Sequence, residues 1–158
     1  MCIIIDANFA PQVFTAKPST DGHPVRTWLA DSSKDGFLIF GGRLGRELLK
    51  RGESRGYLAE LLRAGRAGLI PDAAVEKEET RLKNVAPLQS NDPHVLSLAR
   101  VSGARTLCSH DHHLQADFKN PALVSAPKGS IYQVAAHAHL LRHTSSCGKR
   151  NSARRRSR

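Results

Sequence analysis

Short runs of apolar residues predict the strands of this chain. Four strands are predicted in this way, over residues 2–6, 36–40, 105–108 and 122–124. The first run, Cys2-Ile3-Ile4-Ile5, is rich in β-branched residues and ends in Asp6. Such a continuous run is typical of a strand buried on both faces, as in a parallel sheet. The segment 130–143 is expected to carry a further strand end and a closing helix.

Between these runs, apolar residues recur at the three- and four-residue spacing of helices. Helices are predicted over 25–31, 43–50, 54–64 and 72–83, and from Asp92 to near Gly103. The last of these opens with Asn91-Asp92-Pro93, a capping side chain followed by proline at the first helical position. Strands that alternate with helices predict an α/β fold, a three-layer α/β/α sandwich with a central parallel sheet.

The C-terminal residues differ in composition from the rest of the chain. From Thr144 onward Ser, Arg and Lys dominate, so we predict one domain over 1–143 and a basic, disordered tail over 144–158. Of the formal net charge of +10, the last ten residues supply six positive charges, which leaves +4 for the others. Such a tail raises the affinity for any polyanion without selecting one, and it is equally compatible with an incidental solvated segment.

The cysteines and the hydropathy pattern bear on the compartment. Cys2, Cys108 and Cys147 are widely spaced and form no CxxC pair, so they are interpreted as free thiols in a reducing cytosol. No apolar run approaches the roughly 20 residues of a membrane helix. The first residues also lack the basic segment typical of a signal peptide. We therefore expect a cytoplasmic protein with no membrane partner.

Four carboxylates lie where the predicted strands end or the predicted helices begin. Asp6 ends the first strand, and Asp111 follows the third strand by a short step. Glu47 lies one to two turns into the helix after the second strand, and Asp92 begins a later helix. In a parallel sheet the carboxyl ends of the strands share one edge with the helix N-termini, and ligands bind there. These four side chains are therefore predicted to converge on one edge.

Each of these acids also has a purely structural interpretation. Asp92 alone suits a helix cap, Glu47 alone suits a solvated helix face, and Asp111 alone suits a turn or a cap. Asp6 needs partners in any case, because a carboxylate at the end of a buried strand is costly unless it is paired. The combination of the four favours a shared site.

Clustered carboxylates repel one another, so a site of this kind needs either protonated members or a bound cation. Oxygen ligands suit Mg²⁺ or Mn²⁺ better than a soft metal ion. A metal ion held there lowers the pKa of a bound water and stabilises negative charge on a phosphodiester. The pattern therefore predicts metal-assisted phosphodiester hydrolysis.

The same residues resemble the pattern of the PIN-domain family. The resemblance spans roughly residues 1–132 and is strongest over 90–118. It rests on four motifs: Asp6-Ala7-Asn8 after an apolar strand, Glu47 after a Gly-Gly turn, Asn91-Asp92-Pro93-His94, and Ser109-His110-Asp111 followed by Asp117-Phe118. It implies a PIN-like fold and a metal-dependent ribonuclease, often the toxin of a bacterial or archaeal toxin–antitoxin pair.

The resemblance also implies roles for individual residues and partners. The acidic cluster would be Asp6, Glu47, Asp92 and Asp111, with Asp6, Asp92 and Asp111 as the metal ligands. Asp117 would be an auxiliary acid, and Asn8 and Ser109 would orient ligands through hydrogen bonds. Glu53 lies near enough in the sequence to be the family glutamate in place of Glu47. The implied partners are RNA, a cognate antitoxin and a second copy in a homodimer.

Several assignments stay open at the level of the sequence. Arg43 and Arg46 follow a Gly-Gly turn and are candidates to reach RNA phosphates. Three histidines flank Asp111, at positions 110, 112 and 113, and suit a surface, a phosphate contact, a proton shuttle or a transition metal. The Asp6-x-Asn8 motif also resembles that of HAD-like phosphatases, although Asn8 stands where their second aspartate lies. A PIN-like protein that binds RNA without hydrolysing it is the non-enzymatic alternative.

Overall fold

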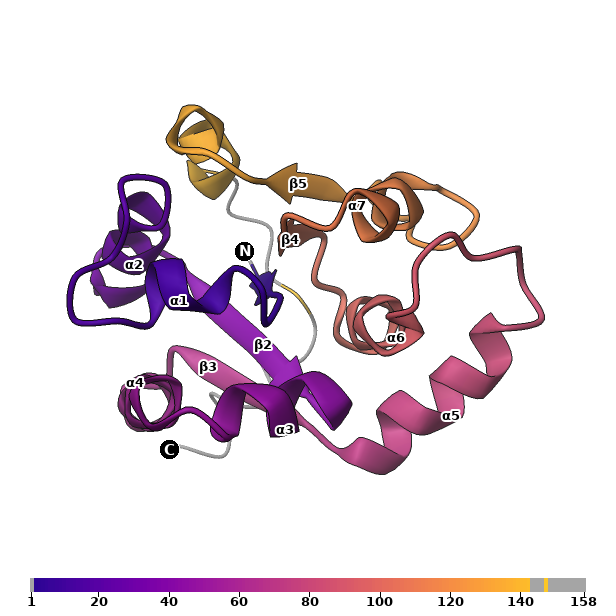
Figure 1. Ribbon diagram of the computed structural model, residues 1–158, viewed down its shortest axis with the longest axis horizontal. Helices are drawn as coiled ribbons and strands as arrows, with labels where there is room; N and C mark the ends of the chain where they lie inside the picture. The colour runs from indigo at the N-terminus through magenta and orange to yellow at the C-terminus, as the bar shows by residue number, and fades with distance from the viewer. Residues whose placement is uncertain (1, 143–146, 148–158) are drawn as a thin grey trace.

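The computed structural model describes residues 2–142 and Cys147. A parallel sheet of five strands lies between two layers of helices, which confirms the predicted α/β/α sandwich (Figure 1). The strands are β1 (Cys2–Ile5), β2 (Phe37–Gly41), β3 (Ala67–Ile70), β4 (Thr106–Cys108) and β5 (Ser130–Tyr132). Their order across the sheet is β3-β2-β1-β4-β5, so β1 occupies the centre.

Within the described residues, eight helical segments connect or follow the strands. They are α1 (Ala10–Val13), α2 (His23–Ala30), α3 (Gly42–Leu49), α4 (Gly52–Arg63), α5 (Asp72–Leu82), α6 (Pro93–Ser102), α7 (His112–Lys119) and the 3-10 helix η1 (Ala135–Arg142). Figure 1 shows α1, α2 and α4 on one side of the sheet and α6 and α7 on the other. Parallel strands joined by right-handed crossovers give this distribution when the strand order reverses. None of the helices in the described part of the chain is both long and apolar enough to span a membrane.

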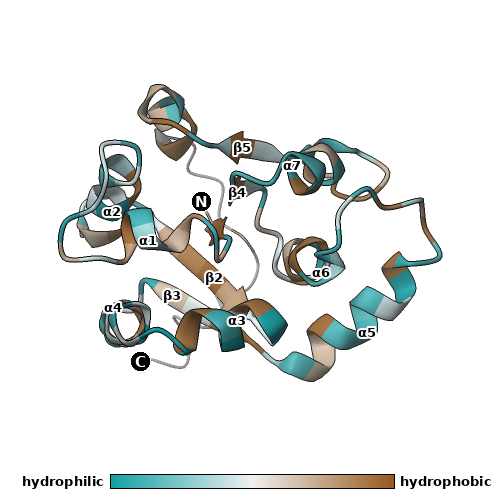
Figure 2. Cartoon of the chain, in the orientation of Figure 1, coloured by the Kyte–Doolittle hydropathy of each residue, from teal (hydrophilic) through white to brown (hydrophobic). Residues whose placement is uncertain are grey.

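The core forms around β1. Ile3 pairs with Leu38 on one side and with Thr106 on the other, and the side chains of Ile3, Ile4 and Ile5 are fully buried. The strands are accordingly among the most apolar segments of the chain, as β2 shows in Figure 2. Burial on both faces explains why these strands consist of continuous apolar runs.

The predicted strand at 122–124 is wrong. Leu123 and Val124 are buried, but their amide groups both donate to the carbonyl oxygen of Asn120 in a turn. The last strand is β5, so burial of an apolar pair was mistaken for strand formation. β3 was not predicted because Gly68 interrupts its apolar pattern. A Cβ atom on Gly68 would lie 2.9 Å from the Phe37 ring, so close packing between β3 and β2 favours glycine there.

The turn from β2 into α3 depends on two glycines. Gly41 has φ of 152°, and a Cβ atom there would lie 2.4 Å from the carbonyl oxygen of Ile70. Gly42 follows with φ of 58°, in the left-handed region that favours glycine. This tight turn starts α3 directly at the end of β2. It thereby places Glu47 in the second turn of α3.

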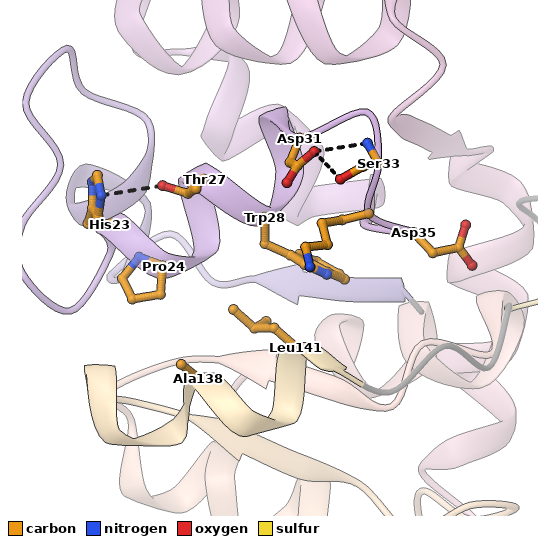
Figure 3. A pocket seen from close by; sticks show the side chains of 10 residues that line it. His23, Pro24, Thr27, Trp28, Asp31, Ser33, Asp35, Ala138 and Leu141 are labelled. Atoms are coloured by element: carbon orange, nitrogen blue, oxygen red, sulfur yellow. Dashed lines mark hydrogen bonds between the residues drawn. The ribbon is translucent and has the colours of Figure 1, made fainter.

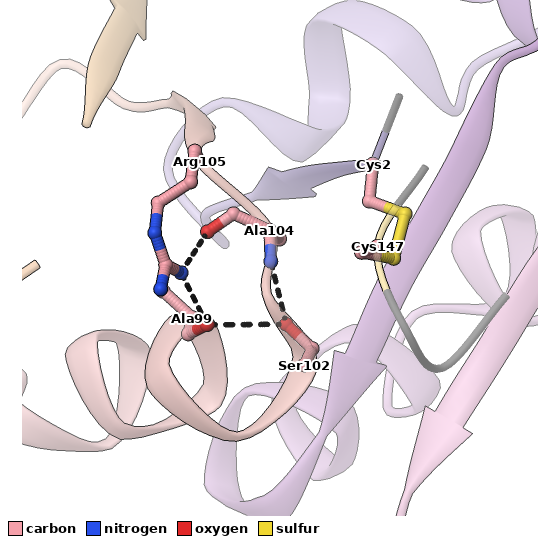
Figure 4. The surroundings of a disulfide bond; sticks show 6 residues. All are labelled: Cys2, Ala99, Ser102, Ala104, Arg105 and Cys147. Carbon is pink, nitrogen blue, oxygen red and sulfur yellow. Dashed lines mark hydrogen bonds between the residues drawn. A yellow bond between two sulfur atoms is a disulfide. The ribbon is translucent and has the colours of Figure 1, made fainter. Parts of the chain in front are cut away.

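The interpretation of all cysteines as free thiols is wrong. Cys2 and Cys147 form a disulfide with their Cα atoms 5.9 Å apart (Figure 4). Cys108 is the free thiol, and complete burial raises its pKa well above the usual range. The 145-residue separation of the bonded pair gives no local spacing signal, because the fold alone brings the two residues together. Of the tail predicted over 144–158, Cys147 is the single described residue, and the others lie outside the described part.

The disulfide is expected to contribute strongly to stability, because it closes nearly the whole chain into a loop. The chain-entropy relation gives up to about 5 kcal/mol for a loop of this length. Dithiothreitol should therefore lower the free energy of unfolding measured in guanidinium chloride. Cys147→Ser should show the lower value with or without the reductant. Equal stability of the oxidised and reduced wild-type proteins would contradict the expectation.

Candidate functional site

The adjacent strands β1 and β4 end where the strand order reverses. From β1 the chain proceeds to β2 and β3 on one side, whereas β4 and β5 lie on the other. The amide of Asp6 donates to the carbonyl oxygen of Cys108 at 2.9 Å, which continues the pairing of the two strands by one residue. Ligands of open α/β sheets bind at such a reversal, outside the carboxyl ends of the strands.

Asp6 is held firmly at this point and is 6% exposed. Its Oδ2 atom accepts a hydrogen bond from Ser109 Oγ at 2.8 Å, and its Oδ1 atom accepts one from the Ala7 amide at 2.8 Å. Ser109 follows β4 directly and is fully buried. The orienting contact expected from Ser109 is therefore made with the central carboxylate.

The pKa of Asp6 reports the surroundings of its carboxyl group. Burial is the main cause that raises this pKa above its ordinary value, and the two hydrogen bonds partly oppose it. The charges of Asp92 and Asp111 raise it further. The fold thus brings three of the four predicted acids within electrostatic reach of one another.

Asp111 caps α7, as its structural interpretation predicted. Its Oδ1 atom accepts from the amides of His113 and Leu114, at 3.0 and 3.2 Å. The amide of Asp111 itself donates to Ser109 Oγ at 3.1 Å. Among the described residues Oδ2 has no hydrogen-bond partner, so one oxygen is available to a ligand.

Asp92 occupies the N-cap position of α6 but does not cap the helix with its side chain. Its amide donates to Ser90 Oγ at 3.4 Å, whereas its carboxylate has no hydrogen-bond partner in the described part of the chain. The residue is half-buried. The capping role proposed as the alternative for Asp92 is therefore not realised, and both carboxylate oxygens are available.

Asp117 contacts the loop that leads to Asp92. Its Oδ2 atom accepts from the amides of Gln89 and Ser90, at 3.0 and 2.9 Å, and Oδ1 also accepts from Gln89 at 3.0 Å. With 2% exposure, this carboxylate is used within the protein. Asp117 therefore acts on the site by positioning the backbone before Asp92.

Other polar side chains fix the segment after β4. Asn8 Oδ1 accepts from the amide of His110 at 3.3 Å, and His110 also contacts the side chain of Gln12. Gln115 Nε2 donates to the carbonyl oxygen of Ser109 at 2.7 Å. The sequence did not point to Gln115, since one buried glutamine on a helix forms no motif. His112 and His113 are exposed at the start of α7.

Glu47 lies at a second part of the same edge. It pairs with Arg43 at 3.3 Å, and its charge acts on His94, a buried residue two positions after Asp92. Burial lowers the pKa of His94, while the charges of Asp92 and Glu47 oppose that shift. Glu53 lies instead at the exposed start of α4, beside a cavity that Pro11 and Phe14 also line. Glu47 therefore lies on a helix that packs against α6, whereas Glu53 lines a different cavity.

The two arginines proposed to contact RNA are exposed on α3 and are paired with acids. Arg43 pairs with Glu47, and Arg46 Nη1 lies 2.7 Å from Asp72 Oδ2. Asp72 Oδ1 also accepts from the amide of Gly42 at 3.1 Å, so it links the start of α5 to the start of α3. Asp72 was not singled out by the sequence, because its role depends on the approach of two helices.

The expected metal-binding cluster is not assembled in this conformation. Across residues 2–142 and Cys147, no set of three or more His, Cys, Asp or Glu side chains is arranged to hold a metal ion. The donor chemistry still fits Mg²⁺ or Mn²⁺, because carboxylate oxygens of Asp92 and Asp111 are unpaired beside the buried carboxyl of Asp6.

No protein-family model matches the chain, and no curated protein matches it at a significant level.

A separate cavity of about 510 Å³ lies between α2 and η1 (Figure 3). Trp28, Pro24 and Leu141 supply its apolar lining, and Asp31 and Thr27 are among its polar residues. None of the four candidate acids contributes to this lining. The cavity is therefore distinct from the carboxylate edge.

The raised pKa of Asp6 predicts a pH-dependent effect of Asp6→Asn on stability. The folded protein holds the Asp6 proton more tightly than the unfolded chain, so the contribution of Asp6 to stability falls as pH rises from about 4 through its folded pKa. In EDTA, the free energy of unfolding of Asp6→Asn relative to the wild type should therefore increase between pH 4 and pH 7. Asp31→Asn is the matched control, because hydrogen bonds from Ser33 lower the pKa of Asp31. Its relative stability should change in the opposite direction, and a pH-independent difference for Asp6→Asn would refute the assignment.

Removal of the Asp117 carboxylate should loosen the loop before Asp92. Asp117→Ala leaves the part-buried amide of Gln89 and the buried amide of Ser90 without their acceptor, and the expected loss is about 3 kcal/mol of unfolding free energy. Hydrogen exchange should become faster at residues 88–92. Glu76→Ala, at an exposed position of α5, is the control and should stay within about 0.5 kcal/mol of the wild type. Unchanged exchange in the loop would show that Asp117 does not hold it.

Proposed function

We propose that the protein is a metal-dependent endoribonuclease of the PIN-like type. The observation that supports it most is the position of Asp6 at the reversal of strand order, where the charges of Asp92 and Asp111 act on its carboxyl group. The charges of three carboxylates from separate segments act on one another there, and each like charge disfavours the ionisation of the others. A hard cation offsets that repulsion, which supports a metal site over a purely structural cluster.

In this proposal Asp6, Asp92 and Asp111 hold Mg²⁺ or Mn²⁺, and Glu47 completes the acidic site. When bound, the cation lowers the pKa of a coordinated water and stabilises negative charge on the scissile phosphodiester. Ser109 keeps Asp6 in one orientation, and its contact with the Asp111 amide couples the two segments. Asp92 offers both of its oxygens because its side chain does not cap α6.

Arg43 and Arg46 are the proposed first contacts with RNA phosphates. Both side chains are more than half exposed, so an incoming phosphate can compete for them with Glu47 and Asp72. An arginine–carboxylate pair at the surface contributes little stability, so such an exchange costs little. A toxin role with a cognate antitoxin and a homodimer stay predictions from the resemblance. A cytoplasmic location stays a prediction from the hydropathy pattern, since the disulfide removes the support expected from the cysteines.

The phosphatase alternative is less well supported. Its second aspartate would stand at Asn8, whose Oδ1 atom accepts a hydrogen bond from the His110 amide. An amide side chain cannot donate a proton as a general acid would. The inactive RNA-binding alternative is also less favoured, because all four candidate acids are present.

The proposal predicts cleavage of single-stranded RNA in Mg²⁺ or Mn²⁺ and its loss in EDTA. Asp6→Asn and Asp92→Asn should each lower the cleavage rate by more than about 100-fold, since each removes a proposed metal ligand. Ser109→Ala should cost about 10- to 100-fold, as is usual for a residue that orients a ligand. Cleavage would be followed with end-labelled RNA, and Asp31→Asn at the C-cap of α2 is the activity control.

Three results would count against this function. Full activity of Asp6→Asn, or activity that EDTA leaves unchanged, would exclude the proposed metal site. RNA binding without cleavage at millimolar Mn²⁺ would favour the inactive alternative. A covalent aspartyl phosphate trapped with an aryl phosphate would favour the phosphatase.

A further inference from the structure

Outside the last ten residues, the excess of positive over negative charge lies in one segment of the chain. Residues 43–66 contain seven Arg or Lys and three Glu, which gives this segment a net charge of +4. The other residues up to position 148 contain eleven basic and eleven acidic side chains. The whole net charge of residues 1–148 therefore lies in the segment that forms α3, α4 and the connection to β3.

Five exposed basic side chains follow one another along α3, the connection to α4 and the first turns of α4. Arg43, Arg46 and Lys50 follow one another at spacings of three and four, which places them on one face of α3. Arg51 joins α3 to α4, and Arg55 lies in the first turns of α4. The Nη2 atom of Arg55 lies 4.0 Å from the position of a Cβ on Gly52, so its side chain reaches back toward Arg51. All five residues are exposed.

Other basic residues of the segment do not join this surface. The guanidinium group of Arg66 donates to the carbonyl oxygens of Trp28, Leu29 and Lys34 and is used inside the protein. Arg63 lies at the far end of α4. Within the described residues, Lys50, Arg51 and Arg55 form no ion pair, in contrast to Arg43 and Arg46. Three positive charges therefore lack a carboxylate partner there.

The basic surface begins beside the candidate acids. Arg43 contacts Glu47, and α3 packs against α6, the helix at whose N-cap Asp92 lies. From Arg43 the surface extends along α3 and onto α4, and α4 packs against α3. On the other side α3 contacts α5, which carries Glu76, Glu78 and Glu79. The charges of this part of α5 largely balance, because Lys77 and Arg81 lie on the same helix and Glu78 pairs with Arg81 and Arg100. A polyanion that approaches the acids is therefore attracted mainly over α3 and α4.

We propose that Arg43, Arg46, Lys50, Arg51 and Arg55, here called the α3–α4 surface, bind the phosphates of single-stranded RNA that lead to the carboxylate edge. This inference rests on the proposed function and adds the path of the substrate. Arginine suits phosphate because its planar group donates two parallel hydrogen bonds. Single-stranded nucleic acid is commonly held in this way, by a row of cations that follows its backbone.

The test compares two triple variants of the full-length protein. Lys50→Gln, Arg51→Gln and Arg55→Gln remove three charges from the α3–α4 surface, outside the carboxylate edge. Lys77→Gln, Lys83→Gln and Lys119→Gln remove three exposed charges from the region of α5 and α7 and serve as the control. Binding of labelled single-stranded RNA is measured by fluorescence anisotropy in EDTA over a range of NaCl concentrations.

The surface triple should weaken binding by at least about tenfold and reduce the slope of log K against log salt by about 2, or about 0.7 for each lost phosphate contact. The control should lower affinity less than about threefold. Equal effects of the two triples would overturn the proposal, since binding would then follow net charge alone. Polyglutamate that competes as well as RNA of equal charge would also overturn it and indicate an acidic protein partner.

Because this assay contains no cleavage step, it separates the two proposals. Selective loss of binding in a protein that cleaves no RNA would support the surface and refute the nuclease. Metal-dependent cleavage together with unchanged binding by the surface triple would support the nuclease and refute the surface. The denaturation midpoints of both triples should match that of the wild type, which shows that folding does not cause the difference.

Discussion

The pairing of β1 with β4 is the interaction on which the candidate site depends. It joins segments about 100 residues apart and ends with the amide of Asp6 bonded to the Cys108 carbonyl. Ser109 then lies beside the Asp6 carboxylate and reaches both it and the Asp111 amide. A shift of this register by one residue would turn the Asp6 side chain to the other face of the sheet. The three fully buried isoleucines before Asp6 oppose such a shift, because they fill both faces of the sheet.

The carboxylates around this pairing are held by different means. Asp6 is fixed by burial and hydrogen bonds, and Asp111 is fixed by the cap it provides to α7. Asp92 is positioned through its backbone, because Asp117 holds the preceding loop. The acid with the fewest contacts of its own is therefore placed by another acid. As a result, carboxylate oxygens of Asp92 and Asp111 are available to a ligand although the positions of both residues are constrained.

Local patterns were sufficient to predict the central strands and most of the longer helices. Continuous burial of β1 and β2 produced apolar runs, and α6 carried both a periodic pattern and proline at its start. The strand β3 was not predicted, because Gly68, which allows close packing of Phe37, interrupts its apolar pattern. A strand was wrongly predicted at Leu123 and Val124, because these residues are apolar but form a turn and no strand pairing. The contact that determines the structure lies about 30 residues away in the first case and within a turn in the second, so a local apolar pattern does not reveal it.

The same limit applies to the candidate site. Parallel topology sends strand ends to one edge, which is why Asp6, Asp92 and Asp111 were predicted to converge. In the structure the charges of Asp92 and Asp111 act on Asp6, but no metal-binding set is assembled among the described residues. The sequence could not show that the side chain of Asp111 caps its helix whereas that of Asp92 does not, because both residues directly precede helices. It also did not assign Gln115 or Asp72, whose roles come from contacts between separate elements.

The disulfide has a consequence for the order in which the molecule is made. Cys2 lies at the start of the central strand and is synthesised before the other four strands, whereas Cys147 follows all five strands. During synthesis the Cys2 thiol must therefore persist until nearly the whole domain has left the ribosome. Cys108 is the other thiol available to it in that interval, and it lies on the neighbouring strand. Burial of Cys108 once β4 is in place removes that competitor before the native partner is complete.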